Sequence, residues 1–269
     1  MSNARAWSEP FEAGRRPDLA RHRPLEGMDR EAAWGGSTGA GVTVAIVDSG
    51  VEGAHPAVGG RLVRSVRVEI DAGGEPFVGE DEPVDVVGHG TACAGLIHAL
   101  APEAELVSVR VLGPNNRGRG LAFARGLDWV VREGIAIANL SLASRRDELF
   151  ATFHDLADRA YFGNTLLVGA ATNAYETAYP GLFASVLSVA AHDVPDPWTF
   201  FHNPRPPVEF GAWGVNVPVA WQQGGQIVAT GNSFATANLT GLATLVRACH
   251  PGARPFEVKA ILAAAATRP

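Results

Sequence analysis

Three residues of this chain could together perform nucleophilic acyl transfer. Asp48 ends a run of apolar residues, His89 stands between two glycines, and Ser233 directly precedes a long apolar stretch. A serine hydroxyl is a weak nucleophile until a neighbouring base takes its proton. A histidine can be that base when a buried carboxylate orients its ring and stabilises the imidazolium. We therefore interpret Asp48, His89 and Ser233 as the acid, the base and the nucleophile of one catalytic site.

Taken singly, each of these residues also suits a structural role. Asp48 could shape a turn, His89 could belong to a glycine-rich loop, and Ser233 could cap the N-terminus of a helix. The order aspartate, histidine, serine along the chain is one of the orders in which this catalytic set recurs on unrelated folds. The combination in this order favours the catalytic interpretation.

Short, continuously apolar runs alternate with amphipathic stretches along the chain. The runs are typical of strands buried on both faces, and they cover 42–47, 106–112, 135–142, 165–171 and 186–190. The stretches between them predict helices over 90–100, 121–132 and 147–162. This alternation predicts an α/β fold with a parallel sheet covered on both faces. Because the carboxyl ends of parallel strands meet at one edge, polar residues are expected to gather there, namely Asp48, Asn139, Ser141, Thr172 and Asn173.

Composition limits the classes of protein to which the chain can belong. Of its 269 residues, 46% are hydrophobic and 19% are charged, so the chain can bury a large core and is not a disordered polymer. A net charge of −6 makes nucleic acid an unexpected main partner. Two cysteines, Cys93 and Cys249, cannot form a disulfide framework for a chain of this length. No apolar run suits a membrane span or a secretory signal, so we expect no membrane partner and a cytoplasmic protein.

We expect one folded domain over residues 26–269, preceded by a flexible N-terminal arm over residues 1–25. The arm is expected because this segment is polar and shows no hydrophobic periodicity. The acidic segment 67–85, which is rich in glycine and proline, predicts a surface excursion rather than a domain boundary. Its carboxylates are expected to be solvated, and they belong to Glu80, Asp81, Glu82 and Asp85.

Three motifs around the candidate catalytic residues resemble those of the subtilases, the subtilisin-like serine proteases. They are VTVAIVDSGVEGAHP around Asp48, GHGTACAGLI around His89 and GNSFATANLTGLATLV around Ser233. The resemblance covers about residues 25–268. It implies a subtilisin-like three-layer sandwich, with a mostly parallel central sheet and helices on both faces. It also implies a serine endopeptidase that hydrolyses peptide bonds through an acyl-enzyme on Ser233.

The same resemblance implies roles for further residues. Asn173, in GAATNAYETAYPGLF, would donate its side-chain N–H to the oxyanion alongside the backbone N–H of Ser233. A peptide or protein substrate would bind as an extended strand between two walls of a cleft. Those walls would be formed by Leu112, Gly118, Ser141, Leu142 and Ala143.

The chain also departs from the family pattern. The serine motif usually reads Gly-Thr-Ser-Met-Ala-Ser/Thr-Pro-His, and here Asn232, Phe234, Ala237 and Asn238 stand in it. Ala143 takes the place of a glycine along which substrate backbone passes. These changes spare the three candidate catalytic residues. They do not indicate which residue the enzyme prefers directly before the bond that it cleaves. A catalytically weak, peptide-binding pseudoprotease therefore stays as an alternative.

No metal and no cofactor are expected. The spacing of His55, His89 and His98 does not match a metal-ligand set, so a metal-dependent hydrolase is the weaker alternative. Many subtilases hold calcium in a loop inserted into the helix after the catalytic histidine. Here that predicted helix leads directly into the next strand, and we expect this calcium site to be missing. Cys93 is expected to be a buried core residue beneath His89.

The expected role is intracellular processing of peptides or precursors. Too few residues precede the region of resemblance to form the folding prodomain that secreted family members carry. General intracellular protein turnover is the alternative role, and the oligomeric state stays open.

Overall fold

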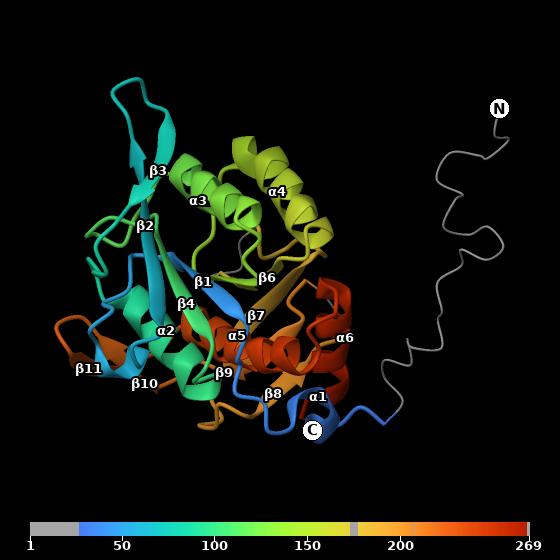
Figure 1. The fold of residues 1–269 in the computed structure, drawn as a ribbon. Coiled ribbons are helices and arrows are strands. Elements are labelled where there is room, and N and C mark those ends of the chain that lie inside the picture. The colour runs from blue at the N-terminus through green and yellow to red at the C-terminus, as the bar shows by residue number, and fades with distance from the viewer. Residues whose placement is uncertain (1–26, 173–176, 206, 268–269) are drawn as a thin grey trace, which may run out of the picture.

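The computed structural model describes residues 27–172, 177–205 and 207–267. Within this part of the chain, nine strands form the central sheet (Figure 1). They are β1 (Thr43–Asp48), β2 (Leu62–Ile70), β3 (Pro76–Glu80), β4 (Glu105–Arg110), β5 (Ile137–Leu140), β6 (Leu166–Ala170), β7 (Val186–His192), β8 (Phe200–His202) and β9 (Phe210–Trp213). Their order across the sheet is β3-β2-β4-β1-β5-β6-β7-β9-β8. The strands between the two edges run parallel, and the edge strands β3 and β8 are antiparallel to their neighbours.

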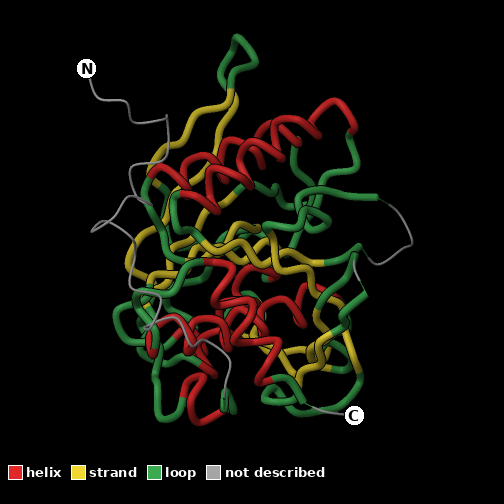
Figure 2. Tube along the Cα trace, turned by 90° about the vertical axis from the view of Figure 1, so that its right-hand side faces the viewer, coloured by secondary structure: helices red, strands yellow, loops and turns green. Residues whose placement is uncertain are grey.

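Helices cover both faces of this sheet. The helices are α1 (Arg30–Trp34), α2 (His89–Leu100), α3 (Gly120–Arg132), α4 (Phe150–Phe162), α5 (Asn232–Cys249) and α6 (Pro255–Ala265). One face packs against α2 and α5, with α1 and α6 beside them, and the other face packs against α3 and α4 (Figure 1). The turned view shows the strands as a middle layer between two helical layers (Figure 2). The predicted three-layer sandwich is confirmed.

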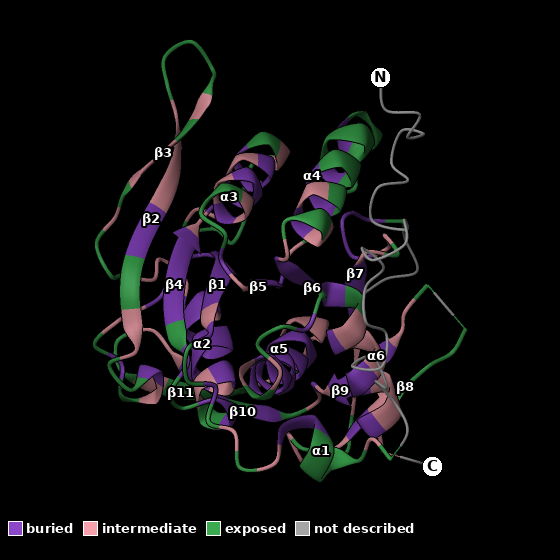
Figure 3. Ribbon diagram, turned by 45° about the vertical axis from the view of Figure 1, so that its right-hand side comes forward, coloured by how far each residue is buried: buried purple, intermediate pink, exposed green. Residues whose placement is uncertain are grey.

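The burial of β1 explains why its sequence is apolar without interruption. Val44 and Ile46 point into the core beneath α2 and α5, whereas Ala45 and Val47 point into the core beneath α3 and α4. All four side chains are fully buried. A strand in the middle of a parallel sheet must be apolar on both faces, because successive side chains alternate between them. The central strands are accordingly buried along their length (Figure 3).

The segment 67–85 lies largely at the surface, as predicted, but it also forms part of the main sheet. Strand β2 runs into it and returns as β3, so that a hairpin extends the main sheet at its edge. The expectation of solvated carboxylates is wrong for Asp81, whose side chain is only 3% exposed. Its two oxygens accept hydrogen bonds from Arg110 at 2.6 and 2.8 Å. The guanidinium groups of Arg110 and Arg67 hold the pKa of Asp81 below its usual value, although burial alone would raise it.

A second, two-stranded sheet lies beside α2. It consists of the antiparallel strands β10 (Val217–Trp221) and β11 (Gly225–Ala229). Two 3-10 helices, Pro56–Val58 and Asp147–Leu149, complete the regular structure of the described residues. In that same part of the chain, no helix combines the length and the apolar character needed to span a membrane. The predicted N-terminal arm over residues 1–25 lies outside the described residues.

Candidate active site

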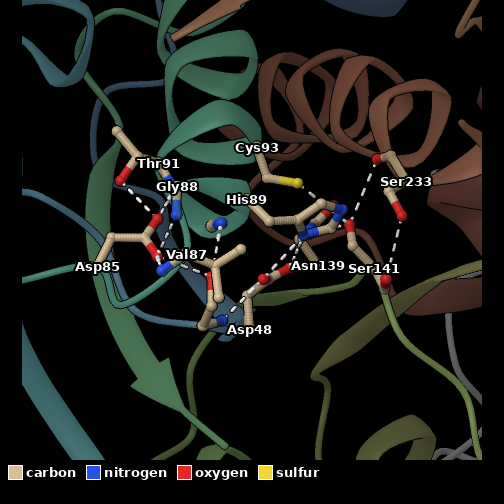
Figure 4. Close-up of polar contacts among 12 residues, drawn as sticks. Asp48, Asp85, Val87, Gly88, His89, Thr91, Cys93, Asn139, Ser141 and Ser233 are labelled. Atoms are coloured by element: carbon tan, nitrogen blue, oxygen red, sulfur yellow. Dashed lines mark hydrogen bonds and ion pairs between the residues drawn. The ribbon is translucent and has the colours of Figure 1, made fainter. Parts of the chain in front are cut away.

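Asp48 and His89 form a direct pair at one end of the sheet. Asp48 is the last residue of β1 and His89 the first residue of α2. The Nδ1 atom of His89 lies 2.8 Å from Oδ1 and 2.9 Å from Oδ2 of Asp48 (Figure 4). The backbone N–H of Ser49 donates to the same carboxylate at 2.7 Å. Asp48 is fully buried, so its carboxylate can orient the ring without competition from water.

The pKa of His89 is raised by this environment. Burial by itself would lower the pKa, because the interior disfavours the charged ring. The charge of Asp48 and its hydrogen bond act in the opposite direction, and the charge of Asp85 adds to them. The net result is a pKa above the ordinary value. The site is therefore built to hold an imidazolium, which is what a base becomes after it accepts a proton.

Ser233 is the second residue of α5 and faces the same region. Its hydroxyl donates a hydrogen bond to the backbone carbonyl of Ser141 at 3.1 Å (Figure 4). Among the described residues, no hydrogen bond joins this hydroxyl to His89. For the candidate nucleophile to reach the candidate base, the Ser233 side chain would have to turn from Ser141 towards the imidazole. Hydrogen bonds of catalytic groups are often long or poorly aligned before a substrate binds.

Asp85 holds the start of the helix that carries His89. Its Oδ1 accepts hydrogen bonds from the hydroxyl of Ser49 and from the backbone N–H groups of Val87 and Gly88, at 2.7–2.9 Å. Its Oδ2 accepts from the backbone N–H and the hydroxyl of Thr91 at 2.8 and 2.7 Å. One carboxylate therefore satisfies five donors around the first turn of α2 (Figure 4). The expectation that Asp85 belongs to a solvated acidic loop is wrong.

A buried polar network lies beneath the site. Asn139, on β5, donates to the hydroxyl of Ser141 at 2.9 Å and accepts from the hydroxyl of Thr240, on α5, at 3.0 Å. The Ser141 hydroxyl in turn lies 3.3 Å from the backbone carbonyl of Ser233 and 3.3 Å from the sulfur of Cys93. Burial raises the pKa of the Cys93 thiol well above its usual value. Cys93 is thus an uncharged, fully buried side chain next to His89, as predicted.

A cleft of about 750 Å³ opens beside these residues. Both His89 and Ser233 line it. All five residues predicted to form the substrate walls line it as well, namely Leu112, Gly118, Ser141, Leu142 and Ala143. They lie on two loops, one between β4 and α3 and the other after β5. The structure therefore brings the candidate base, the candidate nucleophile and both predicted walls to one place.

Comparison with known proteins agrees with this arrangement. The family model described as "Subtilase family" matches residues 39–269. The chain is 34% identical over 236 residues to Subtilisin BL from Lederbergia lenta, covering 83% of this chain and 82% of that protein. It is 30% identical over 227 residues to Thermitase from Thermoactinomyces vulgaris, covering 80% and 77%. The chain belongs to the subtilase family.

Two further comparisons define the extent of this relationship. M-protease from Shouchella clausii is 33% identical over 236 residues, and the match spans 58% of that protein's length. The crystal structure of a cold adapted subtilisin-like serine proteinase matches with a TM-score of 0.71 and 26% identity, covering 85% of this chain and 83% of the other. Membership of the family makes this subtilase a serine-type endopeptidase.

Asn173, the predicted oxyanion donor, lies outside the described residues of this subtilase. The residues just before it are bonded to α5, the helix that carries Ser233, through Asn232. The side-chain amide of Asn232 donates to the backbone carbonyls of Ala171 and Thr172, at 3.0 Å each. Its oxygen accepts from the backbone N–H of Ala191 at 2.8 Å. The asparagine that departs from the family motif thus connects α5 to the ends of two neighbouring strands.

Two other departures from the motif have clear packing roles. Phe234 is 5% exposed, and its ring centroid lies 5.6 Å from that of His89. Asn238 is buried and donates to the backbone carbonyl of Trp213 at 2.8 Å. Both contacts fix the N-terminal half of α5 against its surroundings. Ala143 is exposed and lines the cleft.

One group of three donor atoms among the described residues lies close enough to share a metal ion. It comprises Asp48, His89 and Cys93, whose atoms lie within 4.8 Å of one another. However, Nδ1 of His89 and the carboxylate of Asp48 are already bonded to each other, and the raised pKa of Cys93 disfavours the thiolate that a metal needs. The geometry fits an acid–base pair better than a metal-ligand set. His55 is structural, because its ring bonds the backbone at Ala57 and Gly225.

Sequence reasoning missed Asp85 as a residue of the site. The available signal was an aspartate four residues before the histidine, at a position that could cap the N-terminus of α2. Neighbouring acids hid that signal, because a run of carboxylates is typical of an exposed loop. Sequence reasoning placed Asn139 at the end of its strand near the site but missed its partner Thr240, because the two residues meet only through the packing of α5 on β5.

Proposed function

We propose that this subtilase hydrolyses peptide bonds through an acyl-enzyme on Ser233, with His89 as the proton acceptor and Asp48 as the group that orients it. The observation that carries the proposal is the Asp48–His89 pair, with contacts of 2.8 and 2.9 Å, in the cleft that Ser233 also lines. Because Nδ1 of His89 faces the carboxylate, Nε2 is the nitrogen left to take the serine proton.

The chemical steps follow from these assignments. The Ser233 oxygen attacks the scissile carbonyl carbon while its proton passes to Nε2 of His89. The backbone N–H of Ser233 and the side chain of Asn173 would stabilise the oxyanion. The intermediate collapses as the imidazolium gives its proton to the leaving amine, and the acyl group stays on Ser233. Water, deprotonated by His89, then releases the acyl group and restores the serine.

A serine-directed fluorophosphonate tests the nucleophile directly. We expect one covalent adduct, located on Ser233 by peptide mass mapping, and no adduct and no peptide hydrolysis in Ser233→Ala. The matched control is Ser65→Ala on β2, two strands from β1 in the sheet, which removes a buried hydroxyl that has no hydrogen-bond partner among the described residues. That variant should keep both labelling and hydrolysis. A folded wild-type protein without an adduct would instead support a peptide-binding pseudoprotease.

We further propose that the physiological role is processing of peptides or precursors inside the cell. The state of the two cysteines supports a location inside the cell. Cys93 and Cys249 are both free thiols, and Cys249 is exposed. A reducing compartment keeps such thiols from oxidation. Cleavage of a diverse peptide library should be confined to a narrow set of sequences, whereas broad cleavage would favour general protein turnover. Fractionation of the native host should place the protein in the cytoplasm, and recovery from the medium would contradict this.

A further inference from the structure

The cleft of this subtilase is bordered by arginines from two separate loops. Arg117 and Arg119 come from the loop between β4 and α3, and Arg145 and Arg146 come from the loop after β5. All four line the cleft together with His89 and Ser233, and all four are exposed. Among the described residues that line the cleft, none is an aspartate or a glutamate. The protein has a net charge of −6, whereas the charged side chains that line the cleft are positive.

Neighbouring acids differ between the two loops. Arg146 pairs with Glu148 at 3.1 Å, but both side chains are about two-thirds exposed, at 69% and 66%. Such a pair contributes little and can exchange partners. Asp147 lies beside it and accepts a hydrogen bond from Tyr179 at 3.4 Å. Within the described residues, the side chains of Arg117 and Arg119 form no ion pair and no hydrogen bond. The β4–α3 loop therefore presents two unpaired cations to the cleft.

The local backbone fixes where Arg117 and Arg119 stand. The loop closes on itself, because the N–H of Gly113 donates to the carbonyl of Arg117 at 2.9 Å. Between these two cations, Gly118 packs against the end of β4, where a Cβ atom would lie 2.5 Å from the carbonyl oxygen of Val111. No larger residue fits there without a shift of the backbone. Arg117 and Arg119 thus flank the point where the backbone of Gly118 packs against that of Val111.

The opposite wall is fixed in a similar way. Ser144 and Tyr179 exchange two backbone hydrogen bonds, at 2.9 and 2.8 Å, directly before Arg145. The cleft therefore has a basic loop on each side, and backbone hydrogen bonds hold each loop in place. An extended peptide advances about 3.3 Å per residue, so several of its side chains would pass these loops at once.

We propose that this cleft selects acidic peptides: substrates with aspartate or glutamate within a few residues of the bond that Ser233 attacks. The inference rests on the proposed function, because it assigns the arginines to the path of the substrate. Guanidinium groups suit carboxylates, since their planar donors can bind both carboxylate oxygens. A basic cleft also attracts an acidic peptide before contact, and this attraction weakens as salt screens it.

The test is a set of fluorogenic peptides that differ at one position at a time, with glutamate, glutamine or lysine. We expect kcat/KM to fall in that order at the positions that pass the arginines. The preference for glutamate over glutamine should reach about fivefold per residue at low salt, the equivalent of about 1 kcal/mol for an exposed ion pair. It should shrink between about 50 mM and about 500 mM salt. Equal kcat/KM for the two peptides at low salt would overturn the proposal.

Charge variants locate the source of the preference. Arg117→Gln/Arg119→Gln should move the glutamate-to-glutamine ratio towards one, as should Arg145→Gln/Arg146→Gln. Arg117→Lys/Arg119→Lys should retain most of the preference. The matched control is Arg132→Gln/Arg205→Gln, which removes the same charge from exposed positions outside the cleft. A preference that survives both cleft variants, or that the control variant also abolishes, would show that these arginines do not select the substrate.

Binding to an inactive variant separates the two proposals. Ser233→Ala cannot form the acyl-enzyme, so fluorescence anisotropy of labelled glutamate and glutamine peptides on this variant measures recognition alone. Tighter, salt-sensitive binding of the glutamate peptide supports the basic cleft even when hydrolysis fails. Hydrolysis of the glutamine peptide through Ser233, with equal binding of both peptides, would retain the protease and reject the acidic specificity.

Discussion

The raised pKa of His89 determines how activity depends on pH. Only the neutral imidazole can accept the serine proton, so kcat/KM should rise with pH and reach its midpoint above the usual histidine value of about 6.5. The charged ring is stabilised in the folded state. Its contribution to folding stability is therefore full below the unfolded pKa and is lost as pH rises through the folded pKa. A pH profile that is flat between about 5 and 8 would contradict the role of His89.

Asp85 should influence both the position and the charge of His89. In Asp85→Asn the negative charge is lost and one acceptor becomes a donor that faces the N–H groups of α2. We expect kcat to fall and the midpoint of the pH profile to move down. Asp71→Asn is the matched control, since Asp71 also accepts backbone N–H groups but lies in the hairpin between β2 and β3. A loss of thermal stability in Asp85→Asn without any change in the pH profile would mean that its role is structural only.

Asn173 tests the oxyanion assignment made from the sequence. The oxyanion exists only in the transition state and the tetrahedral intermediate, so Asn173→Ala should lower kcat far more than it raises KM. Removal of one such donor typically costs about 10²–10³ in kcat. Steady-state kinetics on one peptide, with active sites titrated by fluorophosphonate, separate the two constants. A rise in KM at constant kcat would assign Asn173 to substrate binding instead.

At the scale of elements, the junction between α5 and β5 lies beneath Ser233, the proposed nucleophile. Asn139 is fully buried and bonds both Thr240 and Ser141. Asn139→Ala removes one hydrogen bond from each of these hydroxyls, although each keeps a backbone carbonyl as a partner, and should cost about 1–3 kcal/mol of unfolding free energy, measured by urea denaturation. It should also lower kcat, because Ser141 contacts the backbone of Ser233. Thr244→Val is the control, since its hydroxyl bonds only within α5. Equal effects of both substitutions would show that the junction has no special role.

The elements also show what the sequence could and could not predict. The central strands β1, β4, β5, β6 and β7 were predictable because burial on both faces requires continuous apolar runs. Strands β3 and β11 are partly or largely exposed, so their sequences carry no such signal. Local motifs predicted Asp48, His89 and Ser233 as one site; the structure pairs Asp48 with His89 and places His89 and Ser233 in one cleft, and their catalytic roles stay a prediction. The basic cleft was not, because it arises only when two loops about 25 residues apart in the chain meet across the same space.

At the scale of the whole molecule, the connection after α2 bears on calcium. The helix runs without interruption from His89 to Leu100, and β4 begins at Glu105. Hydrogen bonds hold the short link between them: Ala101 N–H donates to the carbonyl of Ile97 at 2.8 Å, Ala104 N–H to that of Ala101 at 3.1 Å, and Glu103 N–H to that of Thr38, before β1, at 2.9 Å. Calcium requires about six to eight oxygen ligands, and the carbonyls of a continuous helix are already occupied.

We therefore expect folding and activity to be independent of calcium. Excess chelator should change the melting temperature by less than about 2 °C, which corresponds to less than about 1 kcal/mol for a chain of this size. An ion present at a thousand times its dissociation constant stabilises a fold by about 4 kcal/mol, so its removal would lower the melting temperature by about 10 °C. Scans with chelator, with added calcium and with added magnesium distinguish a specific site from a general effect of divalent ions. A loss of about 10 °C on chelation that calcium reverses and magnesium does not would show a strong calcium site elsewhere in the molecule.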